Sequence, residues 1–318
     1  MPLRIVLMGT GEFAVLPFRA LLDSEHEIVG VLTQPEKTGR GHHQHVNVVK
    51  ELATGRGVPV FQPERVNRPD MLDILRSLQA DVFIVAAYGQ ILKPELLAIP
   101  RLGAFNLHGS LLPRHRGAAP VQYSIWTGDA VTGVTIFQIE PALDSGPMVG
   151  RVETPIGETE TSGELMLRLA ELSVPLTLQV VGQLADGTAA FEPQDPSQVT
   201  LAPKIPREAG TIDWSKTRCE IGCLVRAMQP WPKASSTLHR QSYAPLRCIL
   251  QQVVPQPNLV PPQTASKTGT VTEFAGRLFV TTGDGWLEML RLQPEGGKSV
   301  DVRSFANGYP LRPGDRFE

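Results

Sequence analysis

The first half of the chain alternates between short apolar runs and segments in which apolar residues recur with helical spacing. Continuous apolar runs are typical of strands buried on both faces of a parallel sheet, and they occur at 4–9, 27–33, 58–63, 81–89, 103–109 and 133–140. Helical spacing occurs at 12–24, 70–79 and 162–187. This alternation predicts an α/β fold with an open, mostly parallel sheet and helices on both faces. In such a fold, ligands bind at the carboxyl ends of the strands.

The pattern changes at about residue 188. Residues 189–206 are rich in proline and polar residues and lack helical spacing, which predicts a linker. The elements expected beyond it are a helix at 216–228 and short strands, separated by turns, at 269–276, 277–285 and 286–294. We therefore expect two domains, at 1–188 and 207–318, and expect the second to be a small β-barrel.

The composition is that of a globular protein, with 42% hydrophobic and 19% charged residues. No apolar run approaches the roughly 18 residues that suggest a membrane span. The first residues lack the basic-then-apolar order of a secretory signal, and the three cysteines have no metal-ligand spacing. We therefore expect a cytoplasmic protein with no membrane partner and no bound metal. Nothing in the sequence indicates an obligate dimer, so we expect a monomer.

The net charge of −2 hides an asymmetry between the two parts of the chain. Residues 1–205 carry 16 basic and 22 acidic side chains, whereas residues 206–318 carry 14 basic and 10 acidic ones, a net charge of +4. A basic module on an acidic body favours an anionic partner for the C-terminal part, such as a nucleic acid, although +4 is modest.

The segment FNLHGSLLPRHRG follows a predicted strand and concentrates polar side chains at its end. Asn106 and His108 are two residues apart on an extended backbone, so their side chains point to the same face. If the strand before Asp144 ends at the same sheet edge, that carboxylate could contact His108. An amide, an imidazole and a carboxylate without an activated nucleophile suit direct transfer of an acyl or formyl group to an amine. A buried core histidine and turn-capping Asn and Asp are the structural alternative.

Three other motifs could carry chemistry. The loop GTGEFA (9–14) matches the dinucleotide-binding fingerprint, but the second strand ends without the acidic residue that would hold a ribose. A tight turn with close packing is therefore the favoured interpretation. GHHQH (41–45) could bind a metal, but a solvated loop is favoured in the absence of nearby carboxylates. Ser110 lacks the strained turn of an acyl nucleophile.

The pattern N-x-H-G-S-L-L-P-x-x-R-G stands intact at 106–117, and LDSG stands at 143–146. With these motifs the sequence resembles the folate-dependent formyltransferases and, over its whole length, the methionyl-tRNA formyltransferases. The resemblance implies a Rossmann-like formyltransferase domain followed by an OB-like barrel. It also implies that Asn106, His108 and Asp144 are catalytic. The residues that it assigns to the folate pocket are Tyr88, Gly89, Gln90, Ile91, Leu92, Ser110, Leu111, Leu112 and Pro113.

The C-terminal part resembles the tRNA-binding domain of the same family, in segments such as RAMQPWPKA (226–234). Near the N-terminus, residues 34–46 occupy the place of the family's tRNA-contacting loop, and Arg40 matches an arginine of that loop. The tRNA contacts that the resemblance implies are Lys37, Arg40, Arg116 and Arg226. Three positions depart from the family pattern. Gly11 replaces a usual proline, and His42 and His43 replace lysines in the loop around Arg40, which predicts weaker or more pH-sensitive contact with tRNA there.

The resemblance implies transfer of the formyl group of 10-formyltetrahydrofolate to the amine of methionyl-initiator tRNA, for translation initiation. The amine attacks directly through a tetrahedral intermediate, with Asn106 and a protonated His108 stabilising the oxyanion and Asp144 supporting the imidazole. A formyltransferase for an amino sugar nucleotide shares these three residues and is the alternative. A catalytically silent folate- or RNA-binding module is a further alternative, which the complete set of three residues argues against.

Overall fold

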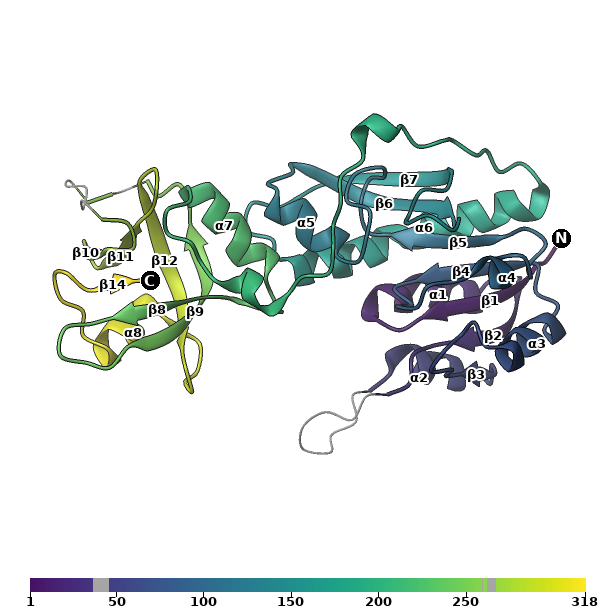
Figure 1. Ribbon diagram of the computed structural model, residues 1–318, viewed down its shortest axis with the longest axis horizontal. Helices are drawn as coiled ribbons and strands as arrows, with labels where there is room; N and C mark the ends of the chain where they lie inside the picture. Colours follow the sequence, from purple (N-terminus) through teal and green to yellow (C-terminus); the bar gives the residue numbers. More distant parts are fainter. Residues whose placement is uncertain (37–45, 259, 262–266) are drawn as a thin grey trace. The chain divides into compact units, whose positions relative to one another are not determined.

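The chain folds as two compact units, seen in the computed structural model of Figure 1. The structure describes residues 1–36, 46–258, 260–261 and 267–318. The first unit comprises Met1–Pro120, Val131–Pro155 and Met166–Pro203, and the second comprises Val121–Ala130, Ile156–Leu165 and Lys204–Glu318. Most of the segment expected to be a linker therefore belongs to the first unit.

The first unit is built on a seven-stranded sheet with the order β3-β2-β1-β4-β5-β6-β7. Its strands are Arg4–Gly9 (β1), Glu27–Leu32 (β2), Val60–Phe61 (β3), Val82–Ala86 (β4), Ala104–His108 (β5), Val131–Gln138 (β6) and Met148–Pro155 (β7). Strands β1 to β5 are parallel, while β6 and β7 pair antiparallel. The predicted α/β fold with a mostly parallel sheet is confirmed. The short apolar runs at 4–9, 81–89 and 103–109 form its buried centre, because helices cover both faces there.

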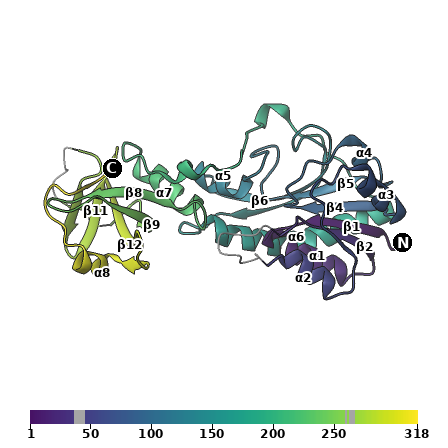
Figure 2. The same ribbon diagram turned by 60° about the horizontal axis from the view of Figure 1, so that its bottom comes forward.

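Helices lie on both faces of this sheet, with α1, α2 and α6 on one side and α3 and α4 on the other (Figure 2). Their bounds are Val15–Leu22 (α1), Val48–Thr54 (α2), Pro69–Ser77 (α3), Pro94–Leu97 (α4) and Ser162–Asp186 (α6), and a short 3-10 helix at Glu12–Ala14 precedes α1. Helix α6 is long enough and apolar enough to cross a membrane, judged by length and composition alone. In this structure, 44% of its most apolar stretch is buried. Its Leu176 and Val180 pack over Gly150 of β7, as in the core helix of a globular domain.

The alternation of side chains along β5 decides which face carries the polar residues. Ala104 packs in the hydrophobic core formed with α3 and α4, together with Phe83 and Val85 of β4. Because side chains in a strand alternate between faces, Asn106 and His108 lie on the same face as Ala104. The expected arrangement, in which these two polar side chains share one face at the carboxyl end of the strand, follows from this register.

The glycine loop after β1 allows neighbouring backbone segments to pack closely. A side chain at Gly9 would lie 2.8 Å from the carbonyl oxygen of Ala86 and 2.9 Å from the Cβ of Ala14, so only glycine fits. The position at the end of β2 where a dinucleotide-binding fold has an acid is Thr33, which is buried and hydrogen-bonded to Asn47. The tight-turn interpretation of GTGEFA therefore accounts for this loop.

The second unit contains an antiparallel sheet with the order β10-β11-β12-β9-β8-β14, and β13 pairs with β12. A bridge between Thr270 and Arg316 joins the two ends of this path, so the sheet closes on itself. Its strands are Ala234–His239 (β8), Leu246–Val254 (β9), Val271–Phe274 (β10), Arg277–Thr281 (β11), Trp286–Pro294 (β12), Val300–Asp301 (β13) and Arg316–Phe317 (β14), and its helices include Arg218–Ala227 (α7) and Val302–Gly308 (α8). Helix α5 (Pro120–Trp126) begins at the boundary between the units. The sequence-based expectation of a small barrel agrees with this sheet.

Candidate active site

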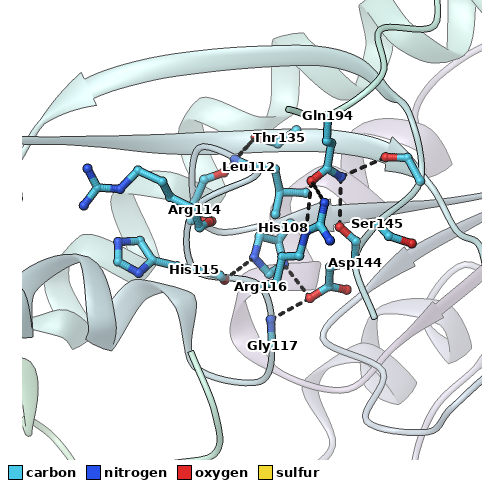
Figure 3. Close-up of polar contacts among 12 residues, drawn as sticks. His108, Leu112, Arg114, His115, Arg116, Gly117, Thr135, Asp144, Ser145 and Gln194 are labelled. Atoms are coloured by element: carbon cyan, nitrogen blue, oxygen red, sulfur yellow. Dashed lines mark hydrogen bonds and ion pairs between the residues drawn. The ribbon is translucent and has the colours of Figure 1, made fainter. Parts of the chain in front are cut away.

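The site is built around His108, the last residue of β5. Its side chain is only 4% exposed, and its Nε2 lies 2.9 Å from the carbonyl oxygen of His115. Because a carbonyl can only accept a hydrogen bond, Nε2 carries the proton in this contact. The other ring nitrogen, Nδ1, faces the carboxylate of Asp144 with 3.8 Å between Nδ1 and Oδ2 (Figure 3). The ring is thus held through Nε2, while Nδ1 faces the carboxylate and is placed to interact with it once the ring takes up a second proton.

Asp144 reaches His108 by a different route from the one that the sequence suggested. Strand β6 runs antiparallel to β5, and the amide of Ile139, just after β6, donates to the carbonyl of Ala104 at the start of β5. The expectation that both strands end at one sheet edge is therefore wrong. The loop 139–147 brings the chain back toward the carboxyl end of β5, and Asp144 adopts a left-handed backbone conformation with φ of 46°. The predicted contact between Asp144 and His108 is nevertheless present.

The Asp144 carboxylate is held by the backbone of the loop after β5. The amide of Gly117 donates to Asp144 Oδ2 at 2.7 Å, a length typical of a charge-assisted hydrogen bond. The side chain of Asp144 is 16% exposed, so the carboxylate remains in contact with solvent while its partner ring is buried. Asn106, two residues before His108, makes no side-chain hydrogen bond within the described part of the chain. Its amide is available to a ligand.

Burial lowers the pKa of His108 below its ordinary value of 6.5, because the charged ring loses its hydration. The Asp144 carboxylate and the His115 carbonyl oppose this shift by favouring the charged ring. The resting imidazole is therefore neutral at neutral pH. A charged His108, as the sequence suggested, is reached only when the ring takes up a proton during the reaction.

Substituting asparagine for Asp144 should lower the pKa of His108 further, because the negative charge that favours the imidazolium is removed while burial remains. The titration of the His108 ring protons in NMR spectra of the two proteins measures this directly. A His108 pKa that rises or stays constant in Asp144→Asn would show that the two side chains are not electrostatically linked. The partly exposed His26 in the same spectra serves as an internal control, since it hydrogen-bonds to Leu3 and not to this pair.

Residues 109–117 form a loop that is fixed from within. The hydroxyl of Ser110 donates to the carbonyl of Arg114 at 2.7 Å, and the amide of Leu112 donates to the hydroxyl of Thr135 on β6. Thr135 in turn donates to the carbonyl of Ser110 at 2.8 Å. Ser110 is completely buried with its proton committed, so the serine has no role as a nucleophile in this geometry. Leu112 and Pro113 are also buried, and Leu111 is half-buried.

The segment after β4, residues 88–92, has one strongly exposed apolar side chain, that of Ile91. Tyr88 and Leu92 are buried, and the side chain of Gln90 is bonded to the backbone of Pro63 and Val66. Gly89 has a positive φ of 82°, and Ile91 is 84% exposed. Burial raises the pKa of Tyr88, so its phenol is neutral, and its hydroxyl has no hydrogen-bond partner in the described residues. The carbonyl of Tyr88 accepts from the side chains of Thr10 and Gln34, and the carbonyl of Ile91 accepts from Asn67. The folate contacts at 88–92 stay predictions.

The residues expected to contact tRNA fall into two groups. Two are arginines with hydrogen-bond partners within the chain, and the others lie outside the described part of the chain. Arg116 binds the side chain of Gln194, with Nη2 at 2.7 Å from Oε1. Arg226 donates to the carbonyls of Gly157 and Glu160. Lys37, Arg40, His42 and His43, and with them the GHHQH segment, lie outside the described residues. The tRNA contacts stay predictions.

The residue that the sequence did not reveal is Gln194. It lies in the proline-rich segment 189–206, and no motif marked it. Its amide bonds to the backbone of the Asp144 loop, as described below. Among the described residues, no group of three or more His, Cys, Asp or Glu side chains is placed to hold a metal ion.

Several solved structures share this fold. The N-formyltransferase from Helicobacter canadensis, in complex with folinic acid and dTDP-3-aminofucose, is 16% identical with a TM-score of 0.65, covering 94% of this chain and 100% of that one. WlaRD, a sugar 3N-formyl transferase, is 16% identical with a TM-score of 0.63, covering 91% and 97%. HypX from Aquifex aeolicus, in complex with tetrahydrofolic acid, is 15% identical with a TM-score of 0.60, and the match covers 98% of this chain but 49% of HypX. This chain thus spans about half the length of HypX, and at these identities the likeness concerns the fold.

Family profiles cover most of the chain. Residues 3–181 match the family described as formyl transferase, and residues 204–310 match the family described as formyl transferase, C-terminal domain. The first match contains Asn106, His108 and Asp144, and the second contains the antiparallel sheet up to β13 and α8. The chain belongs to the formyl transferase family.

Proposed function

We propose that this protein transfers the formyl group of 10-formyltetrahydrofolate to the primary amine of an acceptor. The observation that carries the proposal is the buried His108 ring, whose Nδ1 lies 3.8 Å from the Asp144 carboxylate, on the same face of β5 as the amide of Asn106. WlaRD in the presence of 5-N-formyl-THF and HypX in complex with tetrahydrofolic acid share this fold, which supports a folate as formyl donor.

The site residues have two tasks in the reaction, which are to stabilise the developing oxyanion and to transfer the proton. The amine attacks the formyl carbon, and the carbonyl oxygen becomes an oxyanion to which the Asn106 amide donates. The neutral His108 ring takes up the proton that leaves the attacking nitrogen, and Asp144 stabilises the resulting imidazolium. The imidazolium then supports the oxyanion and gives its proton to N10 of the folate as the bond between the formyl carbon and N10 breaks. Atoms and charge balance without a covalent enzyme intermediate.

As the acceptor we propose methionyl-initiator tRNA. The support comes from the sequence: the motifs of the second unit resemble those of methionyl-tRNA formyltransferases, and residues 206–318 have a net charge of +4, which suits contact with phosphates. The ester of an aminoacyl-tRNA lowers the pKa of its amine toward neutrality, so a free nucleophile is available without a strong base.

The second candidate acceptor is an amino sugar nucleotide. The solved structures favour it, because two of those with this fold are sugar N-formyltransferases, one of them bound to dTDP-3-aminofucose. At 16% identity, these structures share the fold with this chain. The three catalytic candidates, Asn106, His108 and Asp144, are compatible with either amine. The two acceptors differ in charge. A sugar nucleotide carries one pair of phosphates, whereas a tRNA carries all the phosphates of its acceptor arm.

An assay with three acceptors should separate these candidates. The full chain, with 10-formyltetrahydrofolate, is given methionyl-initiator tRNA, methionyl-elongator tRNA or a dTDP-amino sugar, and the formylated product is measured. We expect kcat/KM to be highest with initiator tRNA and to fall as salt increases, because phosphate contacts are screened. A higher kcat/KM with the sugar nucleotide would overturn the tRNA proposal but not formyl transfer. No product with any amine would overturn both.

A further inference from the structure

The segment that follows α6 returns across the first unit and reaches the catalytic loops. Glu192 exchanges two backbone hydrogen bonds of 2.8 Å with Met148 at the start of β7. Leu201 forms a bridge with Arg116, and the carbonyl of Ala202 accepts from the amide of Ala119. The segment 192–202, whose composition is that of a linker, is therefore hydrogen-bonded into the first unit. Gln194 lies within this segment.

The side chain of Gln194 joins three parts of the chain. Its Nε2 donates to the carbonyl of Asp144 and to the carbonyl of Gly146, both at 2.8 Å. Its Oε1 accepts from Nε and Nη2 of Arg116, at 3.1 and 2.7 Å. Both donors and the acceptor of the amide are thus occupied, as Figure 3 shows for its contacts with Arg116 and Asp144. A glutamine with this number of bonds is held in one orientation.

These bonds restrain the two backbone segments that hold the Asp144 carboxylate, namely the backbone of Asp144 itself and the loop that contains Gly117. Asp144 has a left-handed backbone, a conformation that costs an L-residue free energy unless its surroundings hold it. Gln194 holds the carbonyl end of Asp144, and through Arg116 it also holds the loop that contains Gly117, whose amide binds the carboxylate. The separation between Asp144 and His108 therefore depends on a residue that contacts neither ring nor carboxylate.

We propose that Gln194 is a positioning residue for formyl transfer: by joining Arg116 to the Asp144 loop, it sets the Asp144 carboxylate against His108. The inference rests on the proposed function of this site. It gives one residue of the segment 192–202 a part in positioning the catalytic carboxylate, although the segment lies beyond the sheet and its helices. The role is exerted through Asp144, and Gln194 itself touches neither the donor nor the acceptor.

Two substitutions of similar shape separate the bonds of Gln194. Gln194→Met keeps the length of the side chain and removes all four hydrogen bonds. Gln194→Glu keeps an acceptor for Arg116 but replaces the two N–H donors with an oxygen that faces two carbonyls. Gln198→Ala is the matched control, since Gln198 is an exposed glutamine of the same segment whose side chain bonds to Asp195.

The experiment measures kcat, KM for 10-formyltetrahydrofolate and the His108 titration in each purified full-length variant. We expect both Gln194 variants to lower kcat by about tenfold or more, because small misplacements of a catalytic group have effects of this size. KM should change by less than about threefold. In Gln194→Met, which adds no charge, the His108 titration should move to lower pH, because a displaced Asp144 supports the imidazolium less well. Gln198→Ala should match the unsubstituted protein in all three.

The outcomes that overturn the proposal are a kcat within about twofold of the unsubstituted protein in Gln194→Glu, or a fall in kcat with an unchanged His108 titration in Gln194→Met. The second outcome would reveal a purely structural role. The titration does not depend on turnover, so it reads the position of Asp144 even if the unsubstituted protein forms no product. Absence of formyl transfer in that protein would overturn the proposed function, while a titration shifted to lower pH in Gln194→Met would still uphold the placement of Asp144.

Discussion

Replacing His108 with alanine should lower kcat for formyl transfer by about 10³-fold, while KM for 10-formyltetrahydrofolate changes by less than about threefold. The ring is the only proton acceptor that the described residues place in contact with Asp144. Its removal deletes both the acceptor for the ammonium proton and the charge that supports the oxyanion. The residues that we expect to hold the folate, 88–92 and 110–113, do not include the ring, so affinity for the folate should survive.

Steady-state kinetics with saturating acceptor measure this effect, and circular dichroism verifies that the fold is retained. His26→Ala is the matched control, because His26 is a partly exposed histidine bonded to Leu3 at the edge of the first unit. Its kcat should be unchanged. If His108→Ala retained more than about one tenth of the activity, the imidazole would have no place in the proton transfer.

Replacing Gly117 with alanine should reduce both stability and turnover. Gly117 has φ of 130°, a conformation that disfavours L-residues, and an added Cβ would lie 2.5 Å from the carbonyl oxygen of Ala202. The free energy of unfolding should fall by about 2 kcal/mol or more. Since the Gly117 amide holds Asp144, kcat should also fall, by about 100-fold.

Urea unfolding and kinetics of the folded protein measure the two effects of this substitution separately. Gly182→Ala is a matched glycine control in α6, because an added Cβ there meets no atom within 4 Å. Alanine in the helix interior should leave kcat unchanged and stabilise slightly. A Gly117→Ala protein with normal stability and normal turnover would contradict the close approach of the 192–202 segment to the catalytic loop.

The parallel part of the fold could be predicted because its strands are buried on both faces. Continuous apolar runs such as 81–89 carry a signal that does not depend on distant partners. Strand β8 gave no such signal, since its sequence ASSTLH places Ser235 and Ser236 in buried positions. The hydroxyl of Ser236 is satisfied by the indole of Trp214, which is 22 residues away. A contact of this kind is not visible in local pattern.

The three catalytic candidates could be predicted from residue type and spacing, but their arrangement could not. The direction of β6 is set by its pairing with β5 and β7, and a single strand pattern does not specify whether a neighbour is parallel or antiparallel. The neutral state of His108 depends on its complete burial, which the polar composition of the surrounding loop concealed. Gln194 was missed because its function depends on four long-range hydrogen bonds and its neighbours resemble a linker.

The central claim is that His108 and Asp144 act as one proton-transferring pair, and a double-mutant cycle tests it most directly. The kcat for formyl transfer is measured in His108→Ala, Asp144→Ala and the doubly substituted protein. Because the carboxylate works through the imidazole, the double variant should lose no more activity than His108→Ala alone. Losses that multiply, so that the double variant falls by the product of the two single effects, would show that the side chains act independently and would contradict the account.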